Sequence, residues 1–195
     1  REQPAISRAS AEALDQIRST GVRVVEVPES WTLADIGPRT AAVAAAIGAP
    51  KDAADRVTAE ATGESFASPT GPKVAFLYLR GTAAVYLIGG KGSGADALIE
   101  AAGGTDVGAS AGLDPFVPLT PEALVALQPD VILVMTKGLE SVGGVDGLVT
   151  LPGVAQTPAG VSRRVVAVDD TLLLSFGPRT GALIEALHSA LGQSG

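Results

Sequence analysis

One short stretch decides the fold class of this chain, the run Val131-Ile132-Leu133-Val134-Met135. Every side chain in it is apolar, and it has the length of a strand, since a membrane-spanning helix needs about 20 apolar residues. A strand with one solvated face alternates apolar and polar residues, whereas a parallel strand covered on both faces is apolar throughout. The stretch therefore predicts a central parallel strand in an α/β sheet with helices on both faces.

The sequence around this run alternates strands and helices. The patterns predict strands over 73–79, 84–88, 130–135 and 164–168, and helices over 95–102, 121–127 and 180–191. Connections that contain helices favour right-handed crossovers between parallel strands. Residues 71–195 are therefore expected to form one three-layer, Rossmann-like α/β lobe with a mostly parallel sheet.

The N-terminal part does not complete a second sheet. A helix over 10–20 and a strand over 22–27 are predicted, but a strand needs neighbours, and the sequence around it supplies none. We interpret residues 1–50 as the remnant of an N-terminal lobe. Residues 51–70 are expected to serve as a long connecting helix between lobes, with the helical pattern extending over 51–66.

Charge and composition exclude several classes of function. The chain has 14 basic and 21 acidic residues, a net charge of -7, and no long basic run, so nucleic acid is not an expected partner. It has no cysteine, which excludes disulfides and thiolate metal sites. Its single histidine, His188, excludes a multi-histidine metal site. Any metal chemistry must therefore use oxygen ligands.

The predicted strand over 73–79 runs out into Tyr78-Leu79-Arg80-Gly81. In open α/β sheets ligands bind beyond the carboxyl ends of the strands, and residues two apart on a strand point to the same side. A ferric ion and a neighbouring guanidinium both favour the phenolate form of a tyrosine. Tyrosinate is a haem iron ligand, and an arginine beside it can bond the phenolate or a propionate. Tyr78 and Arg80 therefore predict a ligand-binding edge.

Two lysines are further candidates for lining the cleft. Lys91 lies within Gly89-Gly90-Lys91-Gly92-Ser93-Gly94, whose glycine spacing matches neither phosphate-binding pattern and indicates a strand-to-helix turn. Lys137 follows the strand over 130–135 and so lies past a carboxyl end.

A serine hydrolase is an alternative that the motif Gly108-Ala109-Ser110-Ala111-Gly112 raises. Ser110, Asp169 and His188 occur in hydrolase order. A nucleophile elbow, however, needs a strand directly before the serine and a helix directly after it, and small residues flank the motif instead. His188 falls at the border of an apolar helix stripe, where a packed surface role is usual. The motif is therefore interpreted as a loop, and no enzymatic activity is expected.

Several segments resemble the bilobal substrate-binding proteins that serve ABC importers of haem, cobalamin and siderophores. They are Leu98-Ile99-Glu100-Ala101-Ala102-Gly103-Gly104, Leu119-Thr120-Pro121-Glu122-Ala123-Leu124 and Gln128-Pro129-Asp130-Val131-Ile132-Leu133-Val134. Within this family, Tyr78-Leu79-Arg80-Gly81 and Tyr86-Leu87-Ile88-Gly89-Gly90-Lys91-Gly92 look most like haemin-binding lipoproteins of Gram-positive actinobacteria.

The resemblance implies the C-terminal part of a protein that takes haem into a cleft between two lobes and delivers it to a permease in the membrane. It implies Tyr78 as an axial ligand of the haem iron, supported by Arg80. It also implies Glu122 as a contact to the permease, although an acidic residue in a first helical turn is favoured by the helix dipole anyway.

The same resemblance implies an extracytoplasmic location, with a lipid anchor to the outer face of the cytoplasmic membrane through a segment absent from this chain. A histidine ligand from the first lobe is implied as well, and this sequence has none there. Cobalamin or a ferric siderophore remains the alternative ligand, because only Tyr78 and Arg80 argue for iron.

Overall fold

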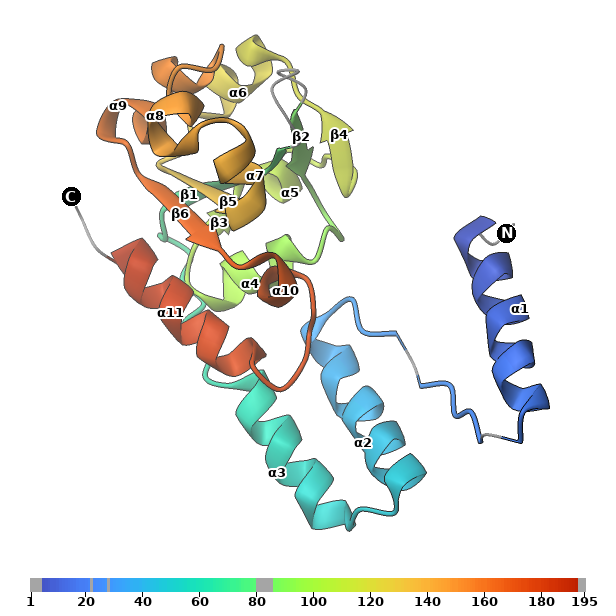
Figure 1. Cartoon of the computed structure of the whole chain (residues 1–195). Helices are drawn as coiled ribbons and strands as arrows, with labels where there is room; N and C mark the ends of the chain where they lie inside the picture. Colours follow the sequence, from blue (N-terminus) through green and yellow to red (C-terminus); the bar gives the residue numbers. More distant parts are fainter. Residues whose placement is uncertain (1–4, 22, 28, 80–85, 193–195) are drawn as a thin grey trace.

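Figure 1 shows the computed structural model, which describes residues 5–21, 23–27, 29–79 and 86–192. Its centre is a sheet of the strands β1 (Lys73–Leu79), β2 (Tyr86–Gly89), β3 (Thr105–Asp106), β4 (Phe116–Pro118), β5 (Val131–Met135) and β6 (Val165–Val168). The strand order is β4-β2-β1-β5-β6, with β3 beside β1. β1 runs parallel to β3 and β5, and β5 runs parallel to β6. The two antiparallel pairs are β1 with β2 and β2 with β4, so the sheet is mostly parallel as predicted.

Helices cover both faces of this sheet (Figure 1). One face carries α4 (Ala95–Ala101), α10 (Asp170–Leu173) and α11 (Thr180–Gly192). The other carries α5 (Val107–Ser110), α6 (Pro121–Leu127), α7 (Thr136–Ser141), α8 (Gly144–Leu148), η2 (Val154–Gln156) and α9 (Pro158–Ser162). The three-layer α/β architecture that the apolar run predicted is therefore confirmed.

The central strands divide their side chains between two buried clusters. Phe76 of β1 lies beside Leu133 of β5 in the cluster under α4 and α11. Leu77 and Ile132 point to the opposite cluster under α6 and α8. All four side chains are at most 1% exposed. Because side chains on both faces of these strands are buried, the strand sequences do not alternate between apolar and polar residues.

A helical arm precedes the sheet and consists of α1 (Ala5–Ser19), η1 (Leu33–Asp35), α2 (Ile36–Ile47) and α3 (Lys51–Thr62). α2 and α3 form a hairpin, with Gly48 at a φ of 71° at the end of α2. Buried Ile36 and Ala61 join the hairpin to the core of the lobe. α1 stands apart from the rest of the chain in Figure 1.

Two predictions for the N-terminal part are wrong. Residues 23–27 form no strand, because no described strand lies beside them to pair with their backbone groups. The helix predicted over 51–66 ends at Thr62, because Gly63 adopts a φ of 59°. The use of α3 as a connector between two lobes, and of residues 1–50 as the remnant of one, stays a prediction.

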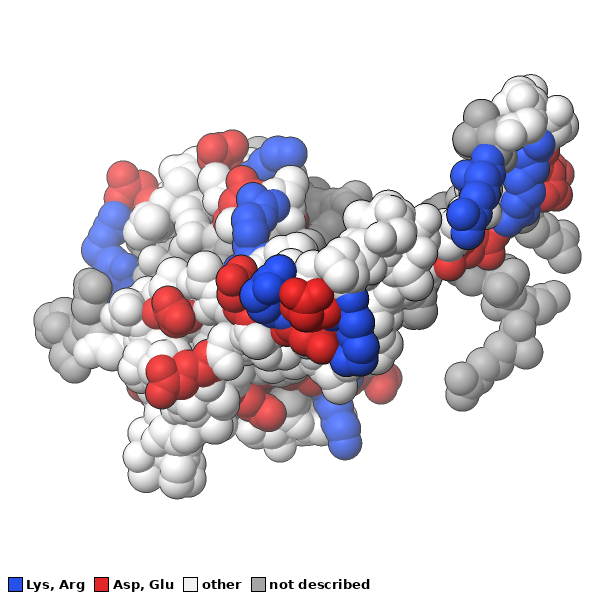
Figure 2. Space-filling view, turned by 90° about the horizontal axis from the view of Figure 1, so that it is seen from below, with Lys and Arg blue, Asp and Glu red and all other residues white. Residues whose placement is uncertain are grey.

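Charged side chains of both signs are interspersed on the face seen in Figure 2. On α3, Lys51 pairs with Asp55 at 2.7 Å and Arg56 pairs with Asp52 at 3.0 Å, all well exposed. Such pairs add little stability but balance the local charge.

Within the described ranges, no helix combines the length and the apolar composition that a membrane span requires.

Asp106 is a buried carboxyl group at the start of α5, and it is 2% exposed. Its Oδ1 accepts a hydrogen bond of 2.8 Å from the Ala109 backbone, which caps the helix. Its Oδ2 has no partner among the described residues. Burial, with smaller effects of the negative charges of Asp96 and Glu100, raises the pKa of Asp106 to about 6.

Asp106→Asn is therefore expected to stabilise the chain at neutral pH by about 1–2 kcal/mol. The full pKa change corresponds to roughly 3 kcal/mol, but the asparagine amide is also buried. The folded state binds the Asp106 proton more tightly, so the contribution of Asp106 to stability falls as the pH rises from about 4 to about 6 and is level above that. The gain from Asp106→Asn should thus be present at pH 7 and vanish below pH 4, as measured by thermal unfolding.

The matched control is Asp169→Asn. The hydrogen bond from the Thr171 hydroxyl lowers the pKa of this exposed carboxyl group. Its contribution therefore has the opposite sign: it stabilises above the unfolded pKa and is lost as the pH falls, so Asp169→Asn should slightly lower the melting temperature at pH 7. Equal gains for Asp106→Asn at pH 3.5 and pH 7 would contradict the assignment.

Candidate ligand-binding site

A pocket of about 260 Å³ opens where the carboxyl ends of β1, β5 and β6 meet. It is lined by Tyr78, Leu79, Met135, Lys137, Gly138, Ser141 and Asp170. Tyr78 and Leu79 come from the end of β1, Met135 ends β5, and the residues after it begin α7. Asp170 is the first residue of α10, which follows β6. The pocket thus lies at the sheet edge where α/β folds bind ligands.

Tyr78 is half-buried near the end of β1, two residues after fully buried Phe76. Residues two apart on a strand share a face, so Tyr78 continues the row of core side chains out to the pocket. Its ring meets the ring of Phe116 edge to face, with centroids 5.8 Å apart and planes at 67°. A tyrosine in this position presents a phenol at the pocket on a rigid strand rather than on a loop.

Lys137 lies on the rim of the same pocket, on the first turn of α7. Its backbone N–H donates to Asp170 Oδ2 at 3.0 Å, which ties α7 to α10 across the end of the sheet. Its side chain is exposed. The structure therefore brings Tyr78 and Lys137 together, one as an oxygen donor and one as a cation.

The other candidate residues lie elsewhere. Lys91 is exposed in the turn after β2, and its backbone N–H donates to Leu113 at 2.9 Å. It is not among the residues that line the pocket. Glu122 is exposed in the first turn of α6, which Thr120 caps through a 3.2 Å bond from the Ala123 N–H. Arg80 lies outside the described residues.

The hydrolase arrangement is not formed. His188 stacks on Phe66, with ring centroids 3.9 Å apart, and its Nδ1 lies 3.0 Å from the Ala102 carbonyl oxygen. Ser110 is exposed at the last residue of α5, so it does not sit on a turn between a strand and a helix. Asp169 is engaged by Thr171 at the end of β6. The three side chains therefore serve separate local contacts.

Sequence reasoning missed Phe116, Ser141 and Asp170. Phe116 lies on a three-residue edge strand, too short for a period-two pattern to show. Asp170 follows the predicted strand over 164–168, so its place past a carboxyl end was a usable signal. Ser141 lies at the end of α7, and its hydroxyl donates to Gly138 at 2.7 Å. No group of three or more metal-ligating side chains occurs in the described part of the chain.

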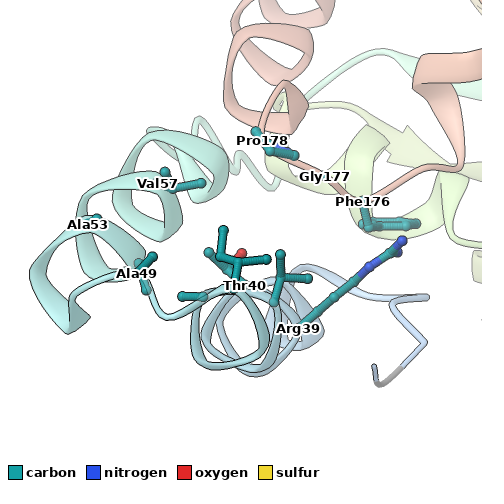
Figure 3. A pocket seen from close by; sticks show the side chains of 12 residues that line it. Arg39, Thr40, Ala49, Ala53, Val57, Phe176, Gly177 and Pro178 are labelled. Carbon is teal, nitrogen blue, oxygen red and sulfur yellow. The ribbon is translucent and has the colours of Figure 1, made fainter. Parts of the chain in front are cut away.

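A second hollow of about 390 Å³ lies between α2, α3 and the loop after α10 (Figure 3). Its lining is mostly apolar and includes Val43, Ile47, Val57 and Phe176. In Figure 3 the side chain of Arg39 points toward Phe176. No tyrosine, carboxylate or histidine is among the described residues that line this groove.

The pocket lies at the sheet edge where α/β folds bind ligands, and the described residues do not form the hydrolase arrangement. The chain belongs to the periplasmic binding protein family, whose model matches residues 5–172. This is a family of extracytoplasmic substrate-binding proteins of transport systems rather than of enzymes, as the sequence led us to expect. A comparison with curated proteins finds no match.

Solved structures of haem-binding proteins match most of the chain. The periplasmic haem-binding protein RhuT from Roseiflexus sp. RS-1 is 44% identical over 92% of this chain and 70% of its own, with a TM-score of 0.83. The haem-binding protein HmuT is 39% identical over 92% of this chain and 61% of its own, with a TM-score of 0.79. BhuT, solved with two haems, is 34% identical over 92% and 70%, with a TM-score of 0.75. The chain thus spans about 58 to 70% of the length of such relatives.

Proposed function

We propose that this chain binds haem in the Tyr78 pocket as the substrate-binding component of an ABC importer and delivers it to a membrane permease. The observation that carries the proposal is Tyr78 itself, a half-buried phenol on the pocket at the carboxyl end of a central strand. The haem-binding relatives at 34 to 44% identity support haem as the ligand.

The pocket chemistry fits one side of a haem molecule. Tyr78 supplies a phenolate for ferric iron, and Leu79 and Met135 offer apolar contacts for the porphyrin. The Lys137 ammonium on the rim suits a propionate. A volume of about 260 Å³ is below the roughly 300–1,000 Å³ of a complete small-molecule site, so this pocket forms one wall of the haem site. Arg80 is proposed to support the phenolate, on the family resemblance.

Haemin titration tests the proposal directly. Adding ferric haemin to the full chain should shift the Soret band in a saturable way and give a phenolate-to-iron charge-transfer band. Cobalamin and a ferric siderophore should not displace the haemin at equal concentrations. Displacement by cobalamin, or a haemin spectrum without the charge-transfer band, would reject haem in favour of the alternative ligands.

Lys137→Gln is expected to weaken haemin binding by about twofold to fivefold without changing the Soret position. An exposed ion pair is worth about 0.2–1 kcal/mol, and the iron ligand is untouched. Wild-type affinity should fall with added salt, and the variant's should fall less. Lys91→Gln, which removes an exposed lysine from outside the pocket lining, is the matched control and should leave affinity unchanged. If Lys91→Gln weakened haemin binding more than Lys137→Gln, the propionate contact would be assigned to Lys91 instead.

Glu122 is proposed to dock on the permease, because it is exposed on the lobe surface and is not among the described residues that line the pocket. Glu122→Gln should reduce haem delivery to permease-containing membranes while haemin affinity stays unchanged. Equal delivery by the variant and the wild type would reject the role.

We also propose a lipid anchor on the outer face of the cytoplasmic membrane, on the resemblance to haemin-binding lipoproteins. Its test is whether the native protein stays with the membrane fraction in high salt.

A further inference from the structure

Phe116 is an aromatic side chain on the edge strand β4 that is 38% exposed. We propose that Phe116 positions the ring of Tyr78 for iron coordination and so affects haem binding through Tyr78. This inference rests on the proposed function and adds a positioning residue to the same site. The observation behind it is that Phe116 packs its ring on the pocket tyrosine as well as on the buried core.

Three aromatic rings on one face of the sheet connect the core to the pocket. Phe76 and Tyr78 share this face of β1, and the ring of Phe116 meets both of them edge to face. The ring centroids of Phe116 and Phe76 are 6.2 Å apart with planes at 72°. Phe76 is fully buried, so one end of the row is fixed in the core, while Tyr78 at the other end lines the pocket.

The contact between Phe116 and Tyr78 spans a whole strand, because β2 lies between β4 and β1. Gly89 of β2 pairs with Phe116 in the sheet register. A Cβ at Gly89 would lie 2.6 Å from Cδ1 of Phe76 and would intrude into the space beside the rings. The glycine therefore leaves room over β2, and an aromatic ring that covers a strand glycine is a recognised stabilising device.

The edge-to-face contact with Phe116 restrains the orientation of the Tyr78 phenol ring, which carries the oxygen proposed to bind iron. Edge-to-face aromatic pairs prefer particular ring orientations, which plain apolar contact does not impose. A side chain that is already held in its bound orientation loses less conformational freedom when it takes up its ligand. Phe116 therefore limits rotation of the phenol on the side that faces β4, and Phe76 in turn holds Phe116.

Phe116→Leu in the full chain tests this role, because it keeps an apolar side chain and removes the ring. We expect haemin affinity to fall about threefold to tenfold, the range of one aromatic pair. The phenolate-to-iron charge-transfer band should weaken, and the high-spin ferric EPR signal should split into more than one species. Phe116→Tyr keeps the ring and should restore both signals. If Phe116→Leu does not fold, Phe116→Met, which also removes the ring, takes its place in the same measurements.

Phe66→Leu is the matched control, since it removes the stacked pair with His188 outside the pocket. Its haem spectrum should be that of wild type. Wild-type spectrum and affinity in Phe116→Leu would overturn the positioning role. So would an equal loss of affinity in both variants with unchanged spectra, because that pattern marks a purely structural residue. An unchanged spectrum in Tyr78→Phe would instead overturn the proposed function itself, and the inference with it.

Discussion

Tyr78→Phe is expected to weaken haemin binding at least about 100-fold and to abolish the phenolate-to-iron charge-transfer band. Loss of a residue that only supports a metal ligand costs about 10- to 100-fold in affinity, so loss of the ligand itself should cost no less. The substitution removes one oxygen and keeps the ring that Phe116 contacts. Thermal unfolding of the haem-free chain separates a loss of the iron ligand from a loss of folded protein.

Ser141→Ala is the control for this prediction. Ser141 lines the same pocket, but its hydroxyl is bonded to the Gly138 carbonyl, so it is not expected to reach the iron. Ser141→Ala should leave the haem spectrum unchanged and alter affinity by less than about threefold. If Tyr78→Phe gave the spectrum and affinity of wild type, Tyr78 would not be the iron ligand.

Gly181→Ala should destabilise the fold by about 3 kcal/mol or more, although alanine usually stabilises a helix relative to glycine by roughly 0.5–1 kcal/mol. The sign is reversed because α11 begins in direct backbone contact with the end of α3. A Cβ at Gly181 would lie 2.2 Å from the Glu60 carbonyl oxygen and 3.0 Å from Cα of Gly63. Backbone atoms cannot rotate away as a side chain would, so the hairpin of α2 and α3 must shift from the lobe.

Gly192→Ala is the matched control on the same helix. A Cβ at Gly192 meets no heavy atom within 4 Å, so this variant should unfold at the wild-type temperature or slightly above it. Thermal unfolding of both variants measures the difference, which should amount to roughly 6–12 °C for a chain of this size. Similar melting temperatures for the two variants would show that the contact between α3 and α11 does not hold the hairpin in place.

Local patterns predicted the lobe well because its elements are long and strongly apolar. The apolar run that ends at Met135 forms β5, and the predicted strand over 73–79 matches β1. The predictions failed where an element depends on partners. Residues 23–27 carry a strand-like pattern yet remain without a strand, since the pattern encodes side-chain spacing but not the presence of a neighbour.

The sequence by itself determined the α/β class, the exclusion of thiolate and multi-histidine metal sites, and the place of Tyr78 at a strand's carboxyl end. Only the tertiary structure decided which side chains surround that tyrosine. Asp170 reaches the pocket because β6 lies parallel to β5, and Phe116 reaches Tyr78 because β4 pairs with β2. The physical reason is that side-chain period is a local property, whereas strand order follows from how all the apolar faces are buried together.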